Sequence, residues 1–164
     1  MRVSFAWVTP SDQLIPEGET DGHLAELREL QDGQRWQLGL LELAGDGDAA
    51  PVCLADPLPN LIQQACLDGV TALAAEGEHV IRPYESEGEI RLKVDGDDVL
   101  LSAGTEPSRR FPRAELLPAL VDCAARYLAA VRRIHAGDAV WDKRLARLDQ
   151  LLASARAALA GKPA

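Results

Sequence analysis

The sequence has only three cysteines and no long apolar run. Cys53, Cys66 and Cys123 are an odd number without C-x-x-C spacing, which fits neither a secreted disulfide framework nor a zinc knuckle. We expect them to be reduced, buried thiols. No apolar stretch approaches the roughly 20 residues that a membrane-spanning helix needs, and the first residues lack the core of a signal peptide. We therefore expect a cytoplasmic protein.

Motifs for catalysis and nucleotide binding are missing as well. The chain contains no G-x-S-x-G, and no G-x-G-x-x-G follows a predicted strand. Its single Gly-Lys pair, Gly161-Lys162, has no phosphate-binding loop around it. We therefore predict no cofactor, while an active site assembled from distant residues stays an open alternative.

Two sets of potential metal ligands fail on spacing. Asp95, Asp97 and Glu106 match positions 1, 3 and 12 of a calcium-binding loop, but valine and leucine stand where that loop needs an oxygen ligand and a glycine. The histidines are spaced too far apart for two of them to share one helix face. They are His23, His79 and His135. We predict no metal site.

The composition is typical of one folded domain. The 164 residues are 47% hydrophobic and 26% charged, close to the globular average. A chain of this size buries about 69% of the surface that it exposes when unfolded, so a core can form without disulfides. We treat residues 1–164 as a single domain.

Charge divides the chain into two unequal parts. Residues 1–107 hold 6 Lys and Arg against 21 Asp and Glu, whereas residues 108–164 hold 11 against 5. The net charge is −15 in the acidic part, +6 in the basic part and −9 overall. An acidic surface repels nucleic acids and anionic membranes, and it speeds association with basic partners. We also expect part of the acidic charge to pair with the basic helices.

The acidic part is predicted to be rich in strands. Residues 2–8 are typical of a strand, and residues 11–22 are typical of an exposed loop. Residues 24–30 and 35–43 flank Asp32-Gly33, a pair that favours a hairpin turn. The leucines of the first arm also fit the spacing of a helix.

A helix and a second hairpin are predicted next. Asp56 followed by a proline is typical of a helix start, and apolar spacing predicts a helix over residues 57–77. Gly69 lies on its apolar side, so either another element approaches there or about 1 kcal/mol of helix propensity is lost. Residues 89–103 alternate around the Asp95-Gly96 turn and predict a hairpin.

The basic part is predicted to form a helical hairpin. One long apolar stripe contains Pro118 near its start and ends before Gly137, and Asp138 is a plausible cap of a second helix. The second helix has a leucine seam over residues 141–159, which we expect to pack on the preceding helix. A seam between two copies, giving a homodimer, is the alternative.

The predicted fold class is therefore α+β. It consists of an antiparallel sheet built from hairpins, one helix between the hairpins, and a C-terminal helical hairpin packed on one face.

Six acidic residues are the candidate partner-binding set. Alternation places three glutamates on one side of the chain, next to three aspartates at the tip of the second hairpin. A charged edge that prevents strand aggregation is the alternative. The six are Glu85, Glu87, Glu89, Asp95, Asp97 and Asp98. A basic cluster of Arg109, Arg110 and Arg113 is expected to pair with the acidic part, with phosphate binding as the alternative.

In size, acidity and the order of hairpins before helices, the chain resembles the immunity proteins that accompany secreted bacterial toxins. Its single asparagine among many Ala, Leu, Arg and Gly residues is typical of a GC-rich bacterial gene. The resemblance implies a non-enzymatic inhibitor that covers a toxin, often by setting acidic groups against a basic surface. We expect a protein-binding protein with a basic protein partner. The alternatives are a small enzyme with a dispersed site and an oligomer that uses the helical hairpin.

Overall fold

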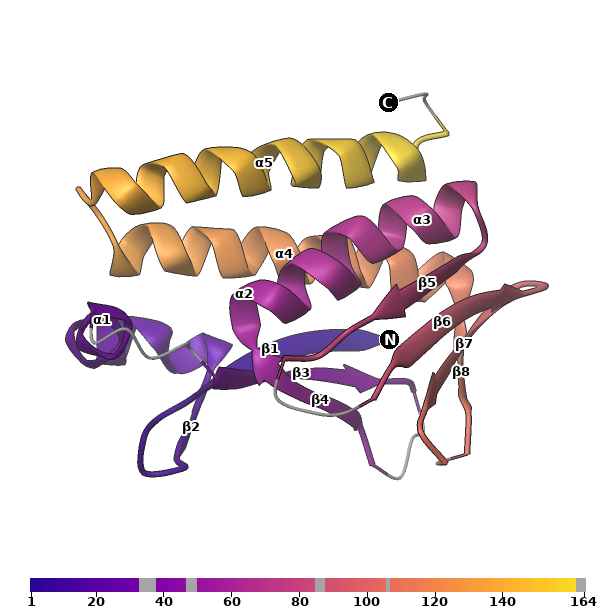
Figure 1. Ribbon diagram of the computed structural model, residues 1–164, viewed down its shortest axis with the longest axis horizontal. Helices are drawn as coiled ribbons and strands as arrows, with labels where there is room; N and C mark the ends of the chain where they lie inside the picture. Colours follow the sequence, from indigo (N-terminus) through magenta and orange to yellow (C-terminus); the bar gives the residue numbers. More distant parts are fainter. Residues whose placement is uncertain (33–37, 47–49, 85–87, 106, 162–164) are drawn as a thin grey trace.

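The structure, a computed structural model, describes residues 1–32, 38–46, 50–84, 88–105 and 107–161. In this part of the chain the strands form two four-stranded antiparallel sheets, and the helices form layers on one side of them (Figure 1). This arrangement confirms the predicted α+β class, although the hairpins are divided between two sheets. The buried apolar residues of both sheets and of the helices make one continuous cluster.

Sheet A has the strand order β2-β1-β3-β4. The strands are β1 (Arg2–Val8), β2 (Leu14–Pro16), β3 (Leu38–Ala44) and β4 (Val52–Pro57). Apolar residues alternate along β1, because one face of the sheet is buried under helices. The predicted first strand is confirmed, and β3 pairs with both β1 and β4.

The region between β1 and β3 differs from the prediction. The predicted loop over residues 11–22 contains β2 and most of η1, a 3₁₀ helix over Glu17–His23. The predicted strand arm over residues 24–30 is wrong, because it lies in a helix, α1 (Leu24–Asp32). The helical spacing of the leucines indicated the correct structure, because a helix here buries Leu27 completely. Residues 33–37, which include Gly33 of the predicted turn, lie outside the described residues.

The central helix has three segments. They are α2 (Leu58–Leu61), the π-helix η2 (Ile62–Asp68) and α3 (Gly69–Ala75). A Cβ atom on Gly69 would lie 2.8 Å from the carbonyl oxygen of Gln64 and 3.3 Å from the ring of His79. The prediction that another element approaches the backbone at Gly69 is therefore confirmed, because His79 belongs to β5.

Asp56 does not cap this helix, which corrects the prediction. The residue belongs to β4, and the position before the helix is held by Pro57 without a side-chain cap. The carboxylate of Asp56 is buried and accepts hydrogen bonds from the side chain of Asn60 and the backbone N of Tyr84. Asp56 thus ties the segment after β5 to the start of α2.

Sheet B is a meander with the strand order β5-β6-β7-β8. Its strands are β5 (Glu78–Ile81), β6 (Ile90–Asp95), β7 (Asp98–Ala103) and β8 (Arg109–Pro112). The β6–β7 pair confirms the predicted second hairpin. The two edge strands, each four residues long, were not predicted from the sequence.

The helical hairpin consists of α4 (Arg113–Ile134) and α5 (Ala139–Leu159). Asp138 caps α5 as predicted, because its carboxylate accepts from the backbone N of Val140 and of Trp141. The leucine seam packs within the chain as predicted, against α4, η2 and α3. Its buried members are Leu145, Leu148, Leu152 and Ala155. None of the described helices combines the length and apolarity needed to cross a membrane.

Candidate binding surfaces

The tip of the β6–β7 hairpin carries three members of the predicted acidic set. Asp95 and Asp98 are direct cross-strand partners, so their side chains lie on one face. Arg110 of β8 donates to both, over 2.7 Å to Asp95 Oδ2 and 3.4 Å to Asp98 Oδ2. The bonds to Asp95 and then Asp98 raise the pKa of the Arg110 guanidinium. The two aspartates thus share an internal counter-charge.

Glu89 also has arginine partners within the chain. Its carboxylate lies 3.3 Å from Nε of Arg82 and 3.9 Å from the guanidinium of Arg91. Glu85 and Glu87 lie outside the described residues. The structure therefore brings the aspartates together at one tip, and Glu89 lies at the other end of β6.

Among the described members of this set, Asp97 is the one whose side chain forms no ion pair with a described residue. It borders a cavity of about 500 Å³ between the hairpin tip and the ends of α3, α4 and α5. Arg113 also lines this cavity, and its guanidinium donates to the carbonyl oxygen of Leu73 over 3.3 Å. One carboxylate and one guanidinium beside apolar walls can hold a small polar group, but they supply no strong nucleophile.

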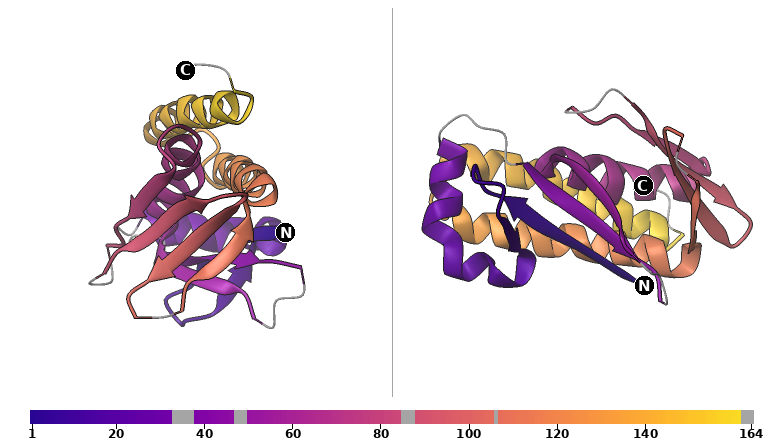
Figure 2. Two further views of the ribbon diagram at one scale, coloured as in Figure 1. Left: turned by 90° about the vertical axis from the view of Figure 1, so that its right-hand side faces the viewer. Right: turned by 90° about the horizontal axis from the view of Figure 1, so that it is seen from below.

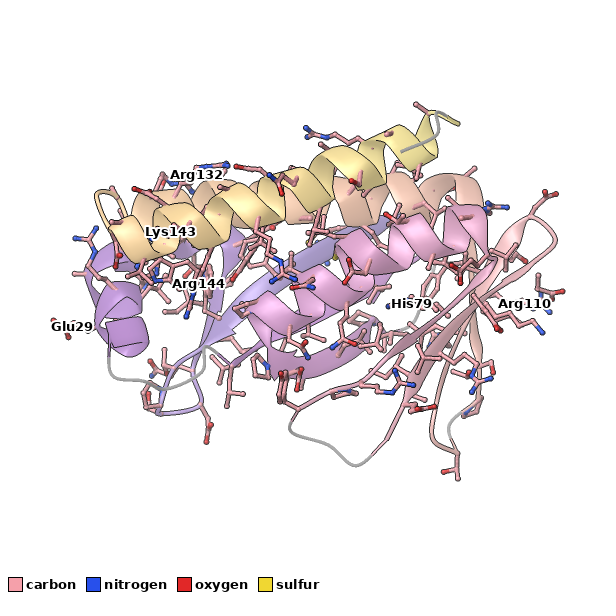
Figure 3. The ribbon with its side chains drawn as sticks, turned by 45° about the horizontal axis from the view of Figure 1, so that its top comes forward. Glu29, His79, Arg110, Arg132, Lys143 and Arg144 are labelled. Carbon is pink, nitrogen blue, oxygen red and sulfur yellow. The ribbon has the colours of Figure 1, made fainter. Side chains whose placement is uncertain are left out.

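The basic cluster has acidic and backbone acceptors. Arg110 pairs with acidic residues, as predicted, and the contacts of Arg109 include a hydrogen bond to the carbonyl oxygen of Ala50 over 3.3 Å. Figure 3 shows Arg110 at one end of the molecule and Lys143 and Arg144 at the other. The basic residues after position 108 therefore do not form one surface.

Groups suited to metal binding do not converge in the part of the chain that the structure describes. Nδ1 of His23 lies 3.0 Å from Glu26 Oε2. Burial lowers the pKa of His79 in β5. His135 stacks on Trp141 with ring centroids 4.2 Å apart. The three histidines thus occupy three different environments.

The three cysteines are free thiols, and the surroundings of two of them raise the thiol pKa. Cys66 and Cys123 are buried as predicted, but Cys53 is exposed, because it points outward from β4. A hydrogen bond to Cys123 and then burial raise the pKa of the Cys66 thiol. Partial burial and then the charge of Glu42 raise the pKa of Cys53. Both shifts disfavour the reactive thiolate.

The two faces of sheet A meet different surroundings. On the inner face, the rings of Phe5 and Trp7 lie 5.6 Å and 5.5 Å from the ring of Tyr127 in α4. Gly39 lies so close to α2 that a Cβ atom there would be 2.2 Å from Cγ of Leu58. Figure 2 (right) shows the sheet from below, with no described helix in front of its outer face.

Cross-strand pairing gathers apolar side chains at one end of this outer face. Val8 pairs with Leu14, and Leu38 follows the Trp7–Gly39 pair, so these three residues form one row. Leu14 is 52% exposed and Leu38 is 41% exposed. The next row contains Pro16, Ala6, Leu40 and Ala55. We call these two rows the apolar rows. Pro16 and Ala55 are exposed too, Val8 and Leu40 are partly exposed, and Ala6 is buried between its neighbours. Exposed apolar area of this kind marks interaction sites.

Carboxylates border the apolar rows on two sides. Glu42 lies in the following row and accepts a hydrogen bond from Ser4 over 3.3 Å. On the other side Leu14 lines a hollow of about 390 Å³ between the β1–β2 turn and η1. Glu19, His23 and Glu26 line this acidic hollow. Glu19 forms no ion pair with any residue in the described ranges.

The sequence pointed to the acidic tip but not to the apolar rows. Leu14 falls in the predicted loop over residues 11–22, and the outward position of Leu38 depends on its pairing with distant strands. The adjacent apolar pair Leu14-Ile15 inside an otherwise polar loop is the signal that could have indicated it.

Comparisons of the chain with models of protein families, with curated proteins and with solved structures found no match.

Proposed function

We propose that the protein binds another protein, without catalysis, through the outer face of sheet A. The observation that carries this proposal is the pair of apolar rows on a sheet face that no described helix covers. Leu14 and Leu38 are about half exposed, so covering them would contribute about 1 kcal/mol each. A stable complex therefore needs contacts beyond these two side chains.

The most concrete form of this proposal is an immunity protein that neutralises a bacterial toxin by covering its active surface. The net charge of −9 favours a basic partner and speeds its association. A cytoplasmic location belongs to the same proposal, and the free thiols support it.

Capture from the native host at low salt tests this function. Three forms are compared: the wild type, Leu38→Asp on the outer face, and Val140→Asp on α5. Val140 is 63% exposed and remote in sequence, so its variant is a matched control for a new surface charge. We expect a stoichiometric protein partner that the wild type and Val140→Asp retain and that Leu38→Asp binds at least about tenfold more weakly. If the partner is an enzyme, saturating binding should abolish its activity.

Two outcomes would contradict the proposal. One is the absence of any stoichiometric protein partner in the wild-type capture. The other is a partner that Leu38→Asp and Val140→Asp retain equally, because that partner would not use the outer face of sheet A. Circular dichroism of the three purified forms separates loss of binding from loss of fold.

A further inference from the structure

We infer that the apolar rows are covered by a partner segment with apolar side chains and a flanking arginine or lysine, which enters the acidic hollow. This inference rests on the proposed function and specifies its partner. Leu14 connects the two features, since it is exposed in the apolar rows and also lines the hollow. A segment that lies across Leu14 therefore passes the mouth of the hollow.

The size of the apolar rows argues that the contact extends onto their charged border. Two rows across four strands span about 250 Å², given strands ~4.8 Å apart and ~3.3 Å per residue. A standard interface buries about 800 Å² on each partner. The partner must therefore also cover the border, where Glu19, Glu26 and Glu42 lie.

Two arginines of α4 pair with other acidic residues of η1. Arg126 of α4 binds Glu17 at 3.2 Å and the carbonyl oxygen of Val3. Arg133 of α4 binds Asp21 at 2.7 Å. These bonds neutralise two acids of η1 and leave Glu19 and Glu26 with His23 as their titratable neighbour in the hollow.

This distribution of charge selects the occupant. Two copies packed face to face would bring their acidic borders together, and like charges across an interface oppose binding. A basic side chain instead gains two carboxylates, and an arginine can bind carboxylate oxygens with two parallel hydrogen bonds. Its aliphatic stem can lie against Leu14 at the edge of the hollow.

Peptide binding tests this inference without the natural partner. The probes are two fluorescent peptides of roughly ten residues, long enough at ~3.3 Å per residue to cross the sheet. One alternates leucine with arginine, and the other alternates leucine with glutamate. Fluorescence anisotropy is measured with the wild type, with Glu19→Gln/Glu26→Gln, with Leu14→Ser, and with the control Glu76→Gln/Glu78→Gln. The control removes two exposed carboxylates that lie outside the hollow.

We expect the wild type to bind the leucine–arginine peptide at least about tenfold more tightly than the leucine–glutamate peptide. Glu19→Gln/Glu26→Gln should weaken that binding about fivefold to tenfold, and Leu14→Ser should weaken it for both peptides. The control variant should bind as the wild type does. The effect of the glutamate pair should shrink as salt rises from about 0.05 M to about 0.5 M.

An equal loss of binding in the two double variants would overturn the inference, because it would reflect net charge alone. So would a wild type that does not distinguish the peptides. If the peptide experiment overturns the inference but a host partner binds in a way that depends on Leu38, the proposed function still stands. If the wild type binds the leucine–arginine peptide selectively but captures no host partner, the proposed function is contradicted. The preference of this surface for an apolar and basic segment is then still supported.

Discussion

Sheets A and B have the same number of strands and the same antiparallel pairing, but their outer faces differ in chemistry. Sheet B exposes Arg91, Lys93 and Asp95 along β6, and Arg110 binds two aspartates across its strands. Sheet A exposes the apolar rows at one end of its outer face. Because both inner faces are packed under helices, the outer faces distinguish the two sheets.

The difference teaches how a sheet with one free face is used. Charged residues and cross-strand ion pairs suit a face that stays in water and discourage strand-to-strand aggregation. A face that keeps leucines exposed carries a standing risk of aggregation, which a bound partner removes. The contrast thus supports a solvated role for sheet B and a binding role for sheet A.

Gly39→Ala should have the largest effect, because it disturbs the inner face of sheet A. The new Cβ atom would lie 2.2 Å from Leu58 Cγ and 2.6 Å from the backbone oxygen of Ala6, which cannot move aside. We expect a loss of about 2–3 kcal/mol in the free energy of unfolding. Gly18→Ala is the control, since nothing lies within 4 Å of its added atom. Urea denaturation measures both, and equal stability of the two variants would refute close packing at Gly39.

Tyr127→Phe should raise stability. The hydroxyl of Tyr127 is buried over the inner face of sheet A and has no hydrogen-bond partner in the described part of the chain. Removing it should contribute about 1 kcal/mol to the free energy of unfolding. A decrease in stability would show that the hydroxyl is hydrogen-bonded.

The same hydroxyl predicts a loss of stability in alkaline solution. Burial raises the pKa of Tyr127, whereas in the unfolded chain the group ionises near pH 10. Above about pH 10 the unfolded state therefore releases a proton that the folded state keeps, and the folded state loses stability as the pH rises. Urea denaturation at pH 8 and about pH 10.5 should show this loss in the wild type and a smaller one in Tyr127→Phe.

Arg110→Gln should have the smallest effect, on the outer face of sheet B. It removes the counter-charge of Asp95 and Asp98, which then face each other across the hairpin. We expect a slight decrease in melting temperature that is larger at low salt than at about 0.5 M salt. Lys93→Gln, which removes a cation that forms no ion pair with a described residue, should show a weaker salt dependence. The same behaviour in both variants would contradict a specific bridge at Arg110.

The sequence predicted the elements whose signals are local. The β6–β7 hairpin follows from strict alternation around Asp95-Gly96, and α5 follows from Asp138 and its leucine spacing. The prediction of a strand over residues 24–30 was wrong. It followed the Asp32-Gly33 turn signal, whereas the leucine spacing indicated a helix, which buries Leu27 in the core. The four-residue strands of sheet B carry too few residues for a period of two to stand out.

The candidate site was less predictable, because it depends on contacts between distant segments. The sequence placed Asp95 and Asp98 at a tip, but only the pairing of β8 with β7 brings Arg110 to them. Leu14 and Leu38 lie in one row of sheet A because β2 and β3 pair with opposite edges of β1. A sequence pattern within one segment cannot predict this long-range pairing.

The π-helical segment η2 has a consequence for insertions and deletions. It joins α2, which packs on sheet A, to α3, which packs on sheet B. A π-helical turn closes over one residue more than an α-helical turn, and the chain continues as an α-helix on both sides of it. Deleting one residue within η2 should therefore convert the wide turn to an α-helical one and leave Gly69 facing His79. The central helix thus has one place where a residue can be lost without changing which side chains face the two sheets.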